Sequence, residues 1–141
     1  MSTRLRERVE KIQQILEKIA TASAKNRLII VEGQKDMRAL RELNVKGKII
    51  MAKTSRKSLL SLTAEIEKQT CDEVILLLDF DRRGKELTKR LTQHLEAARI
   101  KTNTVYWREL KAFMRHDVKD IESIPTYLKT LSKKLLVHKN E

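Results

Sequence analysis

The stretch "VILLLDFDRRG", residues 74–84, decides the fold of this chain. Its five leading apolar residues predict a strand buried on both faces, as in parallel sheets. Asp79 and Asp81 follow the apolar run, and two arginines come directly after them. Because carboxylates are costly inside a buried strand, we expect the strand to end here. The aspartate pair then emerges at an edge of the sheet, where it can hold a divalent metal against a phosphate.

Apolar runs and helical periodicities alternate along the rest of the chain. In order, the expected elements are helix 3–24, strand 27–33, a short helix through Met37, Leu40 and Leu43, strand 47–52, a helix opened by "TSRKS" with Thr54 or Ser55 as its cap, strand 73–81, helix 84–98, strand 101–107, and helices around 110–114 and 125–137. Strands that alternate with helices imply right-handed crossovers and a parallel sheet. We therefore expect an α/β fold with strand order 2-1-3-4, flanked by helices, plus an N-terminal helix.

The length and charge of the chain indicate one basic domain. With 141 residues, it most naturally forms a single compact unit, in which we distinguish an N-terminal amphipathic helix (1–25) from an α/β domain with C-terminal helices (26–141). Lys and Arg number 31 against 19 Asp and Glu, which gives a formal net charge of +12. The excess is spread over the body and favours a polyanionic partner, above all nucleic acid.

Several classes of protein are excluded by the composition. Cys71 is the only cysteine, so a disulfide framework and a cysteine-based zinc site are excluded. The first residues are too charged for a secretory signal, and no apolar run approaches the ~20 residues of a membrane span. We expect a cytoplasmic protein with no membrane partner.

The N-terminal helix has two interpretations. Leu5, Val9, Ile12, Leu16 and Ile19 form a narrow apolar seam. Such a seam packs on its own domain or binds a second copy or a partner protein. We favour packing on its own domain, and a homodimer or partner complex through this helix stays open.

A candidate metal site lies at the carboxyl ends of two strands. In open parallel sheets, ligands bind where the strand order reverses, which for order 2-1-3-4 lies between the first and third strands. The first strand ends in Glu32, and residues two apart in a strand project to the same side, so Asp79 and Asp81 can converge with it. Three carboxylates this close repel one another unless a cation lies between them. Mg²⁺ or Mn²⁺ takes hard oxygen ligands and suits such a site.

Other residues support this site. Gly33 and Gly84 follow the acids and allow the backbone to turn sharply and approach a ligand. The basic residues expected to bind nucleic acid are Lys53, Arg56 and Lys57 after the second strand, and Arg82, Arg83 and Lys85 after the third.

Each feature also has a structural interpretation. Asp36 is either an ordinary acid of a first helical turn or a site residue. Asp79 and Asp81 could instead cap the following helix. Trp107 and Tyr106 fit the core better than stacking on a base. The acids of "VKDIES", residues 118–123, and Asp117 before them fit a solvated turn better than an extra site acid.

"VEGQKDMRAL" and "LLLDFDRRGKEL" together resemble the Toprim domain, which type IA and type II topoisomerases, bacterial-type primases and 5S rRNA maturases share. The residues that match its pattern, in order, are Glu32, Gly33, Asp36, Asp79, Asp81 and Gly84. The resemblance covers roughly residues 27 to 107. It implies a Rossmann-like fold with a four-stranded parallel sheet, Mg²⁺ bound by the carboxylates, and Glu32 as general acid or base. Type IA topoisomerases carry a third acid where this chain has Lys85, so strand passage is not expected.

The predicted function is Mg²⁺-dependent phosphodiester cleavage or nucleotidyl transfer on nucleic acid, with RNA favoured over DNA. The chain is similar in size to small stand-alone Toprim proteins. An alternative is a non-catalytic nucleic-acid-binding accessory subunit whose acids are structural. A third class, the aspartyl-phosphate phosphatases, also places Asp-x-Asp after an apolar strand. There the pair ends the first strand and a Thr or Val stands in the place of Arg83, so this class fits less well.

Overall fold

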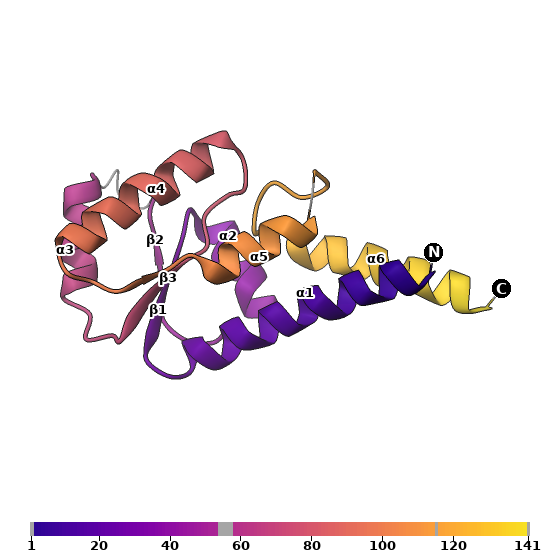
Figure 1. Cartoon of the computed structure of the whole chain (residues 1–141). Coiled ribbons are helices and arrows are strands. Elements are labelled where there is room, and N and C mark those ends of the chain that lie inside the picture. The colour runs from indigo at the N-terminus through magenta and orange to yellow at the C-terminus, as the bar shows by residue number, and fades with distance from the viewer. Residues whose placement is uncertain (1, 54–57, 115, 141) are drawn as a thin grey trace.

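A parallel sheet of four strands forms the centre of the computed structural model, which describes residues 2–53, 58–114 and 116–140 (Figure 1). The strands lie in the order β2-β1-β3-β4, and all three pairings are parallel. The strands are β1 (Arg27–Val31), β2 (Ile49–Met51), β3 (Glu73–Leu76) and β4 (Thr102–Asn103). The helices are α1 (Ser2–Ser23), α2 (Gln34–Glu42), α3 (Leu59–Glu67), α4 (Arg82–Ala97), α5 (Val105–Met114) and α6 (Ile124–Asn140). The predicted fold class and strand order are confirmed.

Both faces of the sheet are covered by helices. Leu28 and Ile30 of β1 face a core closed by α3 and α4. Ile29 and Val31 face a second core, to which α1, α2, α5 and α6 contribute. Because successive strand residues alternate between two apolar layers, β1 and β3 need unbroken apolar runs, which explains the sequence pattern.

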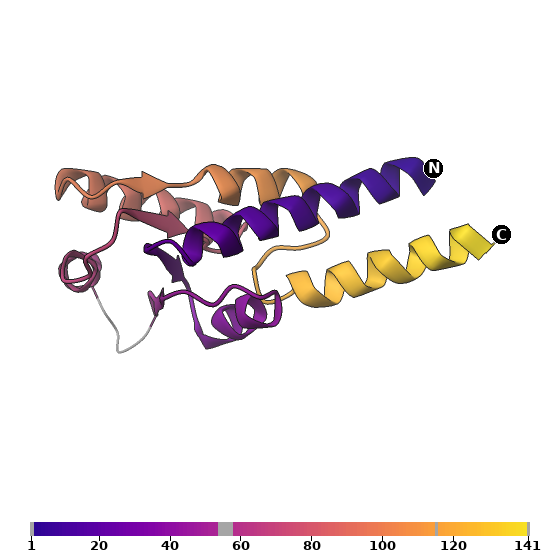
Figure 2. The same cartoon turned by 90° about the horizontal axis from the view of Figure 1, so that it is seen from below.

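Helix α1 packs on its own chain. Val9, Ile12, Ile15, Leu16 and Ile19 are buried in the second core, while the other residues between Val9 and Ile19 are exposed. In both views α1 and α6 lie side by side, with the start of α1 and the end of α6 at the same end of the molecule (Figures 1 and 2). Among the described residues, no helix combines the length and apolarity needed to cross a membrane.

All four strands are shorter than we predicted from sequence, and the difference is largest for β3 and β4. The ladder of β3 ends at Leu76, although Leu77 and Leu78 are fully buried and Leu77 N still donates to Ile30 O at 2.9 Å. The predicted strand 101–107 is confined to Thr102–Asn103. The Asn103 side chain accepts a hydrogen bond from Val105 N at 2.8 Å, so the chain turns into α5 there. The prediction that residues 105–107 are strand was wrong because a local turn overrides their β propensity.

Two helices begin away from the expected residues. Ser58 caps α3 by accepting a hydrogen bond from Ser61 N at 3.1 Å. Thr54 and Ser55, the caps we expected, lie outside the described residues. Helix α4 begins at Arg82 rather than at residue 84, because Asp81 caps it.

Trp107 belongs to the core, as the sequence favoured. Its side chain is buried, its Nε1 donates to Leu78 O at 2.7 Å, and its ring lies 6.2 Å from that of Phe80. Leu78 lies beyond the β3 ladder, so its carbonyl needs a partner from outside the sheet. Trp107 supplies that partner and holds α5 against the end of β3.

Replacing Trp107 by Phe should therefore lower the free energy of unfolding by about 2–4 kcal/mol, since it removes the hydrogen bond and leaves a cavity. Urea denaturation measures this loss. The matched control is Tyr106→Phe on the half-buried neighbour, which should change stability by less than about 0.5 kcal/mol. Equal effects for the two variants would contradict the assigned role of Trp107.

Candidate functional site

The tips of β1 and β3 lie next to each other. The two strands pair in register from Arg27 opposite Glu73 to Ile30 opposite Leu76. One residue beyond β1, Glu32 is only 6% exposed, and its Oε1 accepts a hydrogen bond from Asp79 N at 3.4 Å. The adjacency of the two strand tips that the sequence predicted is present in the structure.

Five carboxyl side chains line one cavity of about 420 Å³ at these tips. We call it the acidic cavity and define it by Glu32, Asp36, Asp79, Asp120 and Glu122. The last two come from the turn at residues 116–123, between α5 and α6. The sequence favoured a solvated turn for these acids, but the structure places Asp120 and Glu122 beside the strand tips.

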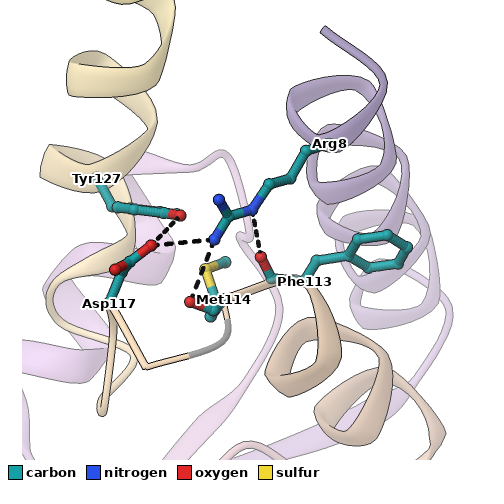
Figure 3. A network of polar contacts seen from close by, with 5 residues as sticks. All are labelled: Arg8, Phe113, Met114, Asp117 and Tyr127. Atoms are coloured by element: carbon teal, nitrogen blue, oxygen red, sulfur yellow. Dashed lines mark hydrogen bonds and ion pairs between the residues drawn. The ribbon is translucent and has the colours of Figure 1, made fainter. Parts of the chain in front are cut away.

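This turn is held by Arg8 of α1 (Figure 3). The Arg8 guanidinium donates to the Phe113 and Met114 carbonyls at 2.7 and 3.3 Å at the end of α5, and Met114 O also accepts from Asp117 N at 3.2 Å. It also pairs with Asp117 at 3.2 Å, and the Tyr127 hydroxyl of α6 donates to the same carboxylate at 3.0 Å. Both hydrogen bonds lower the pKa of Asp117, and the bond from Tyr127 has the larger effect. Helix α1 therefore fixes the position of a turn that contributes to the site.

Asp36 joins the turn to the tip of β1. Its Oδ2 accepts a hydrogen bond from Gly33 N at 3.0 Å, and its Oδ1 accepts one from Glu122 N at 3.1 Å. Burial raises the pKa of Asp36, and the two backbone hydrogen bonds oppose that rise. Of the two interpretations from the sequence, both apply in part: Asp36 stabilises the start of α2, and it also lines the acidic cavity.

Asp79 is the most perturbed group of the site. The pKa of Asp79 is raised to about 8. Burial is the largest cause, followed by a hydrogen bond to the Glu32 side chain and by the charges of Glu32, Asp36 and Asp81. Its Oδ1 is buried and has no hydrogen-bond partner within the described part of the chain. A carboxyl group in this position stays protonated at neutral pH unless a cation compensates its charge.

Lys53 partly neutralises the cavity. Its Nζ lies 3.0 Å from Glu32 Oε2, and this hydrogen bond raises the pKa of Lys53. The backbone strengthens the pairing, since Lys53 N donates to Glu32 O at 2.9 Å. Lys53 was predicted to bind nucleic acid, and its ammonium is still 65% exposed at the rim.

Asp81 has a different environment from Asp79. Its Oδ1 accepts a hydrogen bond from Gly84 N at 2.7 Å as the cap of α4. It lines a second pocket together with Phe80, Arg82 and Lys85, and it is not among the residues that line the acidic cavity. The rule that residues two apart share a side does not extend to this pair, because the β3 ladder ends before Asp79 and the helix cap turns Asp81 away.

The carboxylates fit a hard divalent cation in part. Across residues 2–53, 58–114 and 116–140, no three His, Cys, Asp or Glu side chains lie close enough together to hold a metal ion. Glu32 and Asp79 nevertheless share one cavity, supply carboxylate oxygens, and include one buried oxygen without a partner. These are the properties of a pair that a Mg²⁺ or Mn²⁺ ion would satisfy.

The predicted basic residues occupy different places. Arg82, Arg83 and Lys85 lie exposed in the first turn of α4, while Arg56 and Lys57 lie outside the described residues. The charge of Arg83 opposes the rise in the pKa of Lys53, so Arg83 lies near the acidic cavity. Sequence reasoning missed Arg108, Lys111 and Lys119, which line the second pocket with Lys85. The spacing of Arg108 and Lys111 on α5 was a usable signal, hidden by the wrong strand prediction at residues 105–107, whereas Lys119 lies in the turn at 116–123.

The two glycines of the site differ in their structural role. A Cβ on Gly84 would lie 2.0 Å from Asp79 O, so only glycine allows α4 to approach the end of β3 this closely. A Cβ on Gly33 would meet nothing within 4 Å. The open space beside Gly33 agrees with the expected close approach of a ligand, whereas Gly84 is required by the fold itself.

Comparisons with known proteins agree with the resemblance seen in the sequence. The family model "Toprim domain" matches residues 27–110. A UPF0292 protein of Methanosarcina acetivorans is 34% identical over 129 residues, which cover 92% of this chain and 88% of that protein. A UPF0292 protein of Methanocaldococcus jannaschii is 36% identical over 120 residues, covering 84% and 91%. A solved structure from Aquifex aeolicus shares the fold with a TM-score of 0.67 at 21% identity, covering 78% of this chain and 94% of its own.

Gly84→Ala should destabilise the protein by about 2–4 kcal/mol, because the new methyl group clashes with the Asp79 backbone. Thermal or urea unfolding measures the loss. The matched control is Gly33→Ala, which places the same methyl group in open space and should cost less than about 1 kcal/mol. A stable Gly84→Ala protein would show that the approach of α4 to β3 is not as close as described.

Asp79→Asn should stabilise the protein in a pH-dependent way. From about pH 4 to about pH 8 the unfolded chain loses the Asp79 proton while the folded protein keeps it, so Asp79 lowers stability as pH rises. The variant should match wild type near pH 4 and exceed it by several kcal/mol near pH 8, since each unit of pKa shift corresponds to about 1.4 kcal/mol. Denaturation without divalent ions at several pH values tests this, with exposed Asp72→Asn as the control that shows no such trend. A pH-independent difference would contradict the raised pKa.

Proposed function

Because the chain belongs to the Toprim family, we propose that it is a Mg²⁺-dependent enzyme that cleaves or transfers phosphodiester bonds in nucleic acid. The observation that carries this proposal is the pairing of Glu32 with Asp79. Among the described residues, the buried Oδ1 of Asp79 has no hydrogen-bond partner. The protein around this pair has a net charge of +12. RNA is favoured over DNA through the resemblance to the 5S rRNA maturases.

Glu32 and Asp79 would hold the metal ion. Asp81 lines the neighbouring pocket and not this cavity, so it would serve as the third carboxylate only by turning its Oδ2, which the cap to Gly84 N does not use, toward the ion. When bound, Mg²⁺ or Mn²⁺ supplies positive charge that stabilises a phosphate group during displacement. Binding would also lower the pKa of Asp79, because the cation compensates the charges that now raise it.

The remaining residues would bind and orient the substrate. Glu32 is the candidate general acid or base, and its ion pair with Lys53 fixes one of its oxygens. Lys53 and Arg83 place positive charge near the cavity, where a phosphodiester backbone would lie. Asp36 acts as a positioning residue that holds the β1 tip and the turn at 116–123 together.

One observation favours the alternative of a non-catalytic nucleic-acid-binding subunit. Asp81 caps α4, and the Lys53 ammonium already neutralises Glu32, so both acids have structural partners in the folded protein. In that case the basic surface would bind nucleic acid and the acids would serve only the fold. The two functions differ in whether binding and turnover depend on a divalent ion.

Asp81→Asn should reduce Mg²⁺-dependent cleavage at least about 100-fold while changing nucleic-acid affinity less than about threefold. Asparagine caps a helix as well as aspartate does, so the fold should be preserved. Cleavage of labelled RNA and DNA across a Mg²⁺ titration gives the rate, and fluorescence anisotropy gives the affinity.

Asp72→Asn, at the opposite end of β3, is the matched control and should retain full activity. Retained cleavage by Asp81→Asn in a clean preparation would overturn the assignment of this residue. Failure of the wild-type protein to cleave either polymer with Mg²⁺ or Mn²⁺, together with affinity indifferent to both ions, would favour the accessory subunit.

A further inference from the structure

A second pocket, of about 600 Å³, is lined by Phe80 and Asp81, the two residues that follow Asp79 of the acidic cavity. We call it the basic pocket and define it by Arg82, Lys85, Arg108, Lys111 and Lys119. These side chains come from α4, from α5 and from the turn at 116–123. Phe80 N donates to Lys119 O at 2.7 Å, so the turn is fastened to the end of β3. The fold, rather than one flexible loop, brings the five cations together.

Two lysines in this pocket lie close to each other. Lys85 and Lys111 both line it, and burial, together with the neighbouring Lys85, lowers the pKa of Lys111. The Lys111 ammonium also lies 5.4 Å from the centre of the Trp107 ring, which offers only partial compensation. Like charges at this separation disfavour the protein without a ligand and favour an anion between them.

Among the described residues, carboxylates leave most of the positive charge of the basic pocket without an ion pair. In the part of the chain that the structure describes, no ion pair joins a carboxylate to Lys85, Arg108, Lys111 or Lys119. The remaining cation, Arg82, pairs with Glu86. Asp81 is the only acid among the pocket's lining residues described, and its Oδ1 is engaged by Gly84 N. The pocket therefore keeps several cations for an external anion.

The charge of the pocket selects among phosphate groups. A phosphodiester carries a single negative charge, whereas a phosphomonoester carries about −1.5 to −2 at neutral pH and three strong acceptor oxygens. Lysines from two helices, with Arg108 beside them, match the monoester better, because each acceptor oxygen can receive its own charged hydrogen bond. We propose that the basic pocket binds the terminal phosphate of a nucleic-acid strand.

The position of the pocket bears on the substrate. Asp79 lines the acidic cavity and Asp81 lines the basic pocket, and residues two apart are separated by at most about 7 Å along the chain. A strand whose end lies in the basic pocket would present a bond close to that end to the acids. Only this last step rests on the proposed function; the binding of a terminal phosphate does not.

The test measures binding without catalysis. Fluorescence anisotropy in the presence of a chelator gives the affinity for three RNA oligonucleotides of one sequence, carrying a 5′-phosphate, a 3′-phosphate or no terminal phosphate. Wild type should bind one of the phosphorylated oligonucleotides roughly 10-fold more tightly than the unphosphorylated one. The double variant Lys85→Gln/Lys111→Gln should lose this preference and bind all three alike.

Lys89→Gln is the matched control, because it removes the same charge from an exposed position one turn further along α4. It should keep the full preference for the phosphorylated end. Arg108→Gln provides an independent variant of the same pocket and should reduce the preference in part. Thermal unfolding confirms that the variants are folded.

Equal affinity of wild type for the three oligonucleotides would overturn the proposal, as would a preference that survives in the double variant. Inorganic phosphate should compete with the phosphorylated oligonucleotide on wild type. Competition by inorganic phosphate without any preference among the oligonucleotides would identify a free phosphate as the ligand and would also overturn it. Because no divalent ion is present, these outcomes are independent of whether the protein cleaves nucleic acid.

Discussion

The parallel pairing of β1 with β3 is the constraint on which the rest of the structure depends. Its register brings Ile30 opposite Leu76, and the next hydrogen bond, from Leu77 to Ile30, carries the alignment beyond the ladder. Glu32 and Asp79 follow within a few residues and meet across the same pair of strands. Apolar burial on both faces of the sheet holds this register, because a slip by one residue would turn every side chain to the other face.

Two pockets of different charge lie next to each other at the end of β3. Asp79 lines the acidic cavity, and Asp81, two residues later, lines the basic pocket, where five cations gather. Both pockets receive residues from the turn at 116–123, which Arg8 fixes from the opposite end of the sequence. A protein of net charge +12 thus gathers five of its 19 acids in one cavity, which Lys35, Arg38 and Lys53 also line. A polyanion would be attracted by the net positive charge and repelled by the carboxylates of the acidic cavity.

The sequence predicted the parts of this arrangement that depend on apolar runs. The strand order and the meeting of Glu32 with Asp79 followed from two buried strands and the rule for parallel sheets. The place of Asp81 did not follow, because a helix cap competes locally with the strand and wins at that residue.

Asp120 and Glu122 carried no local signal of their site. A hydrogen bond from Glu122 N to Asp36, which lies 86 positions earlier in the sequence, holds their turn at the cavity. The basic pocket was missed for a related reason: Arg108 and Lys111 line it from a helix that sequence propensity assigned in part to a strand.

The ion pair between Lys53 and Glu32 has a consequence for metal selectivity. Any cation that uses both Glu32 oxygens must first separate this pair, so its apparent affinity falls in proportion to the share of molecules in which the pair is closed. A strongly attracted divalent ion overcomes that competition more readily than Na⁺ or K⁺, because its charge is doubled. With the metal site proposed above, the tethered ammonium would act as an internal competitor and would set the ion concentration at which the cavity fills.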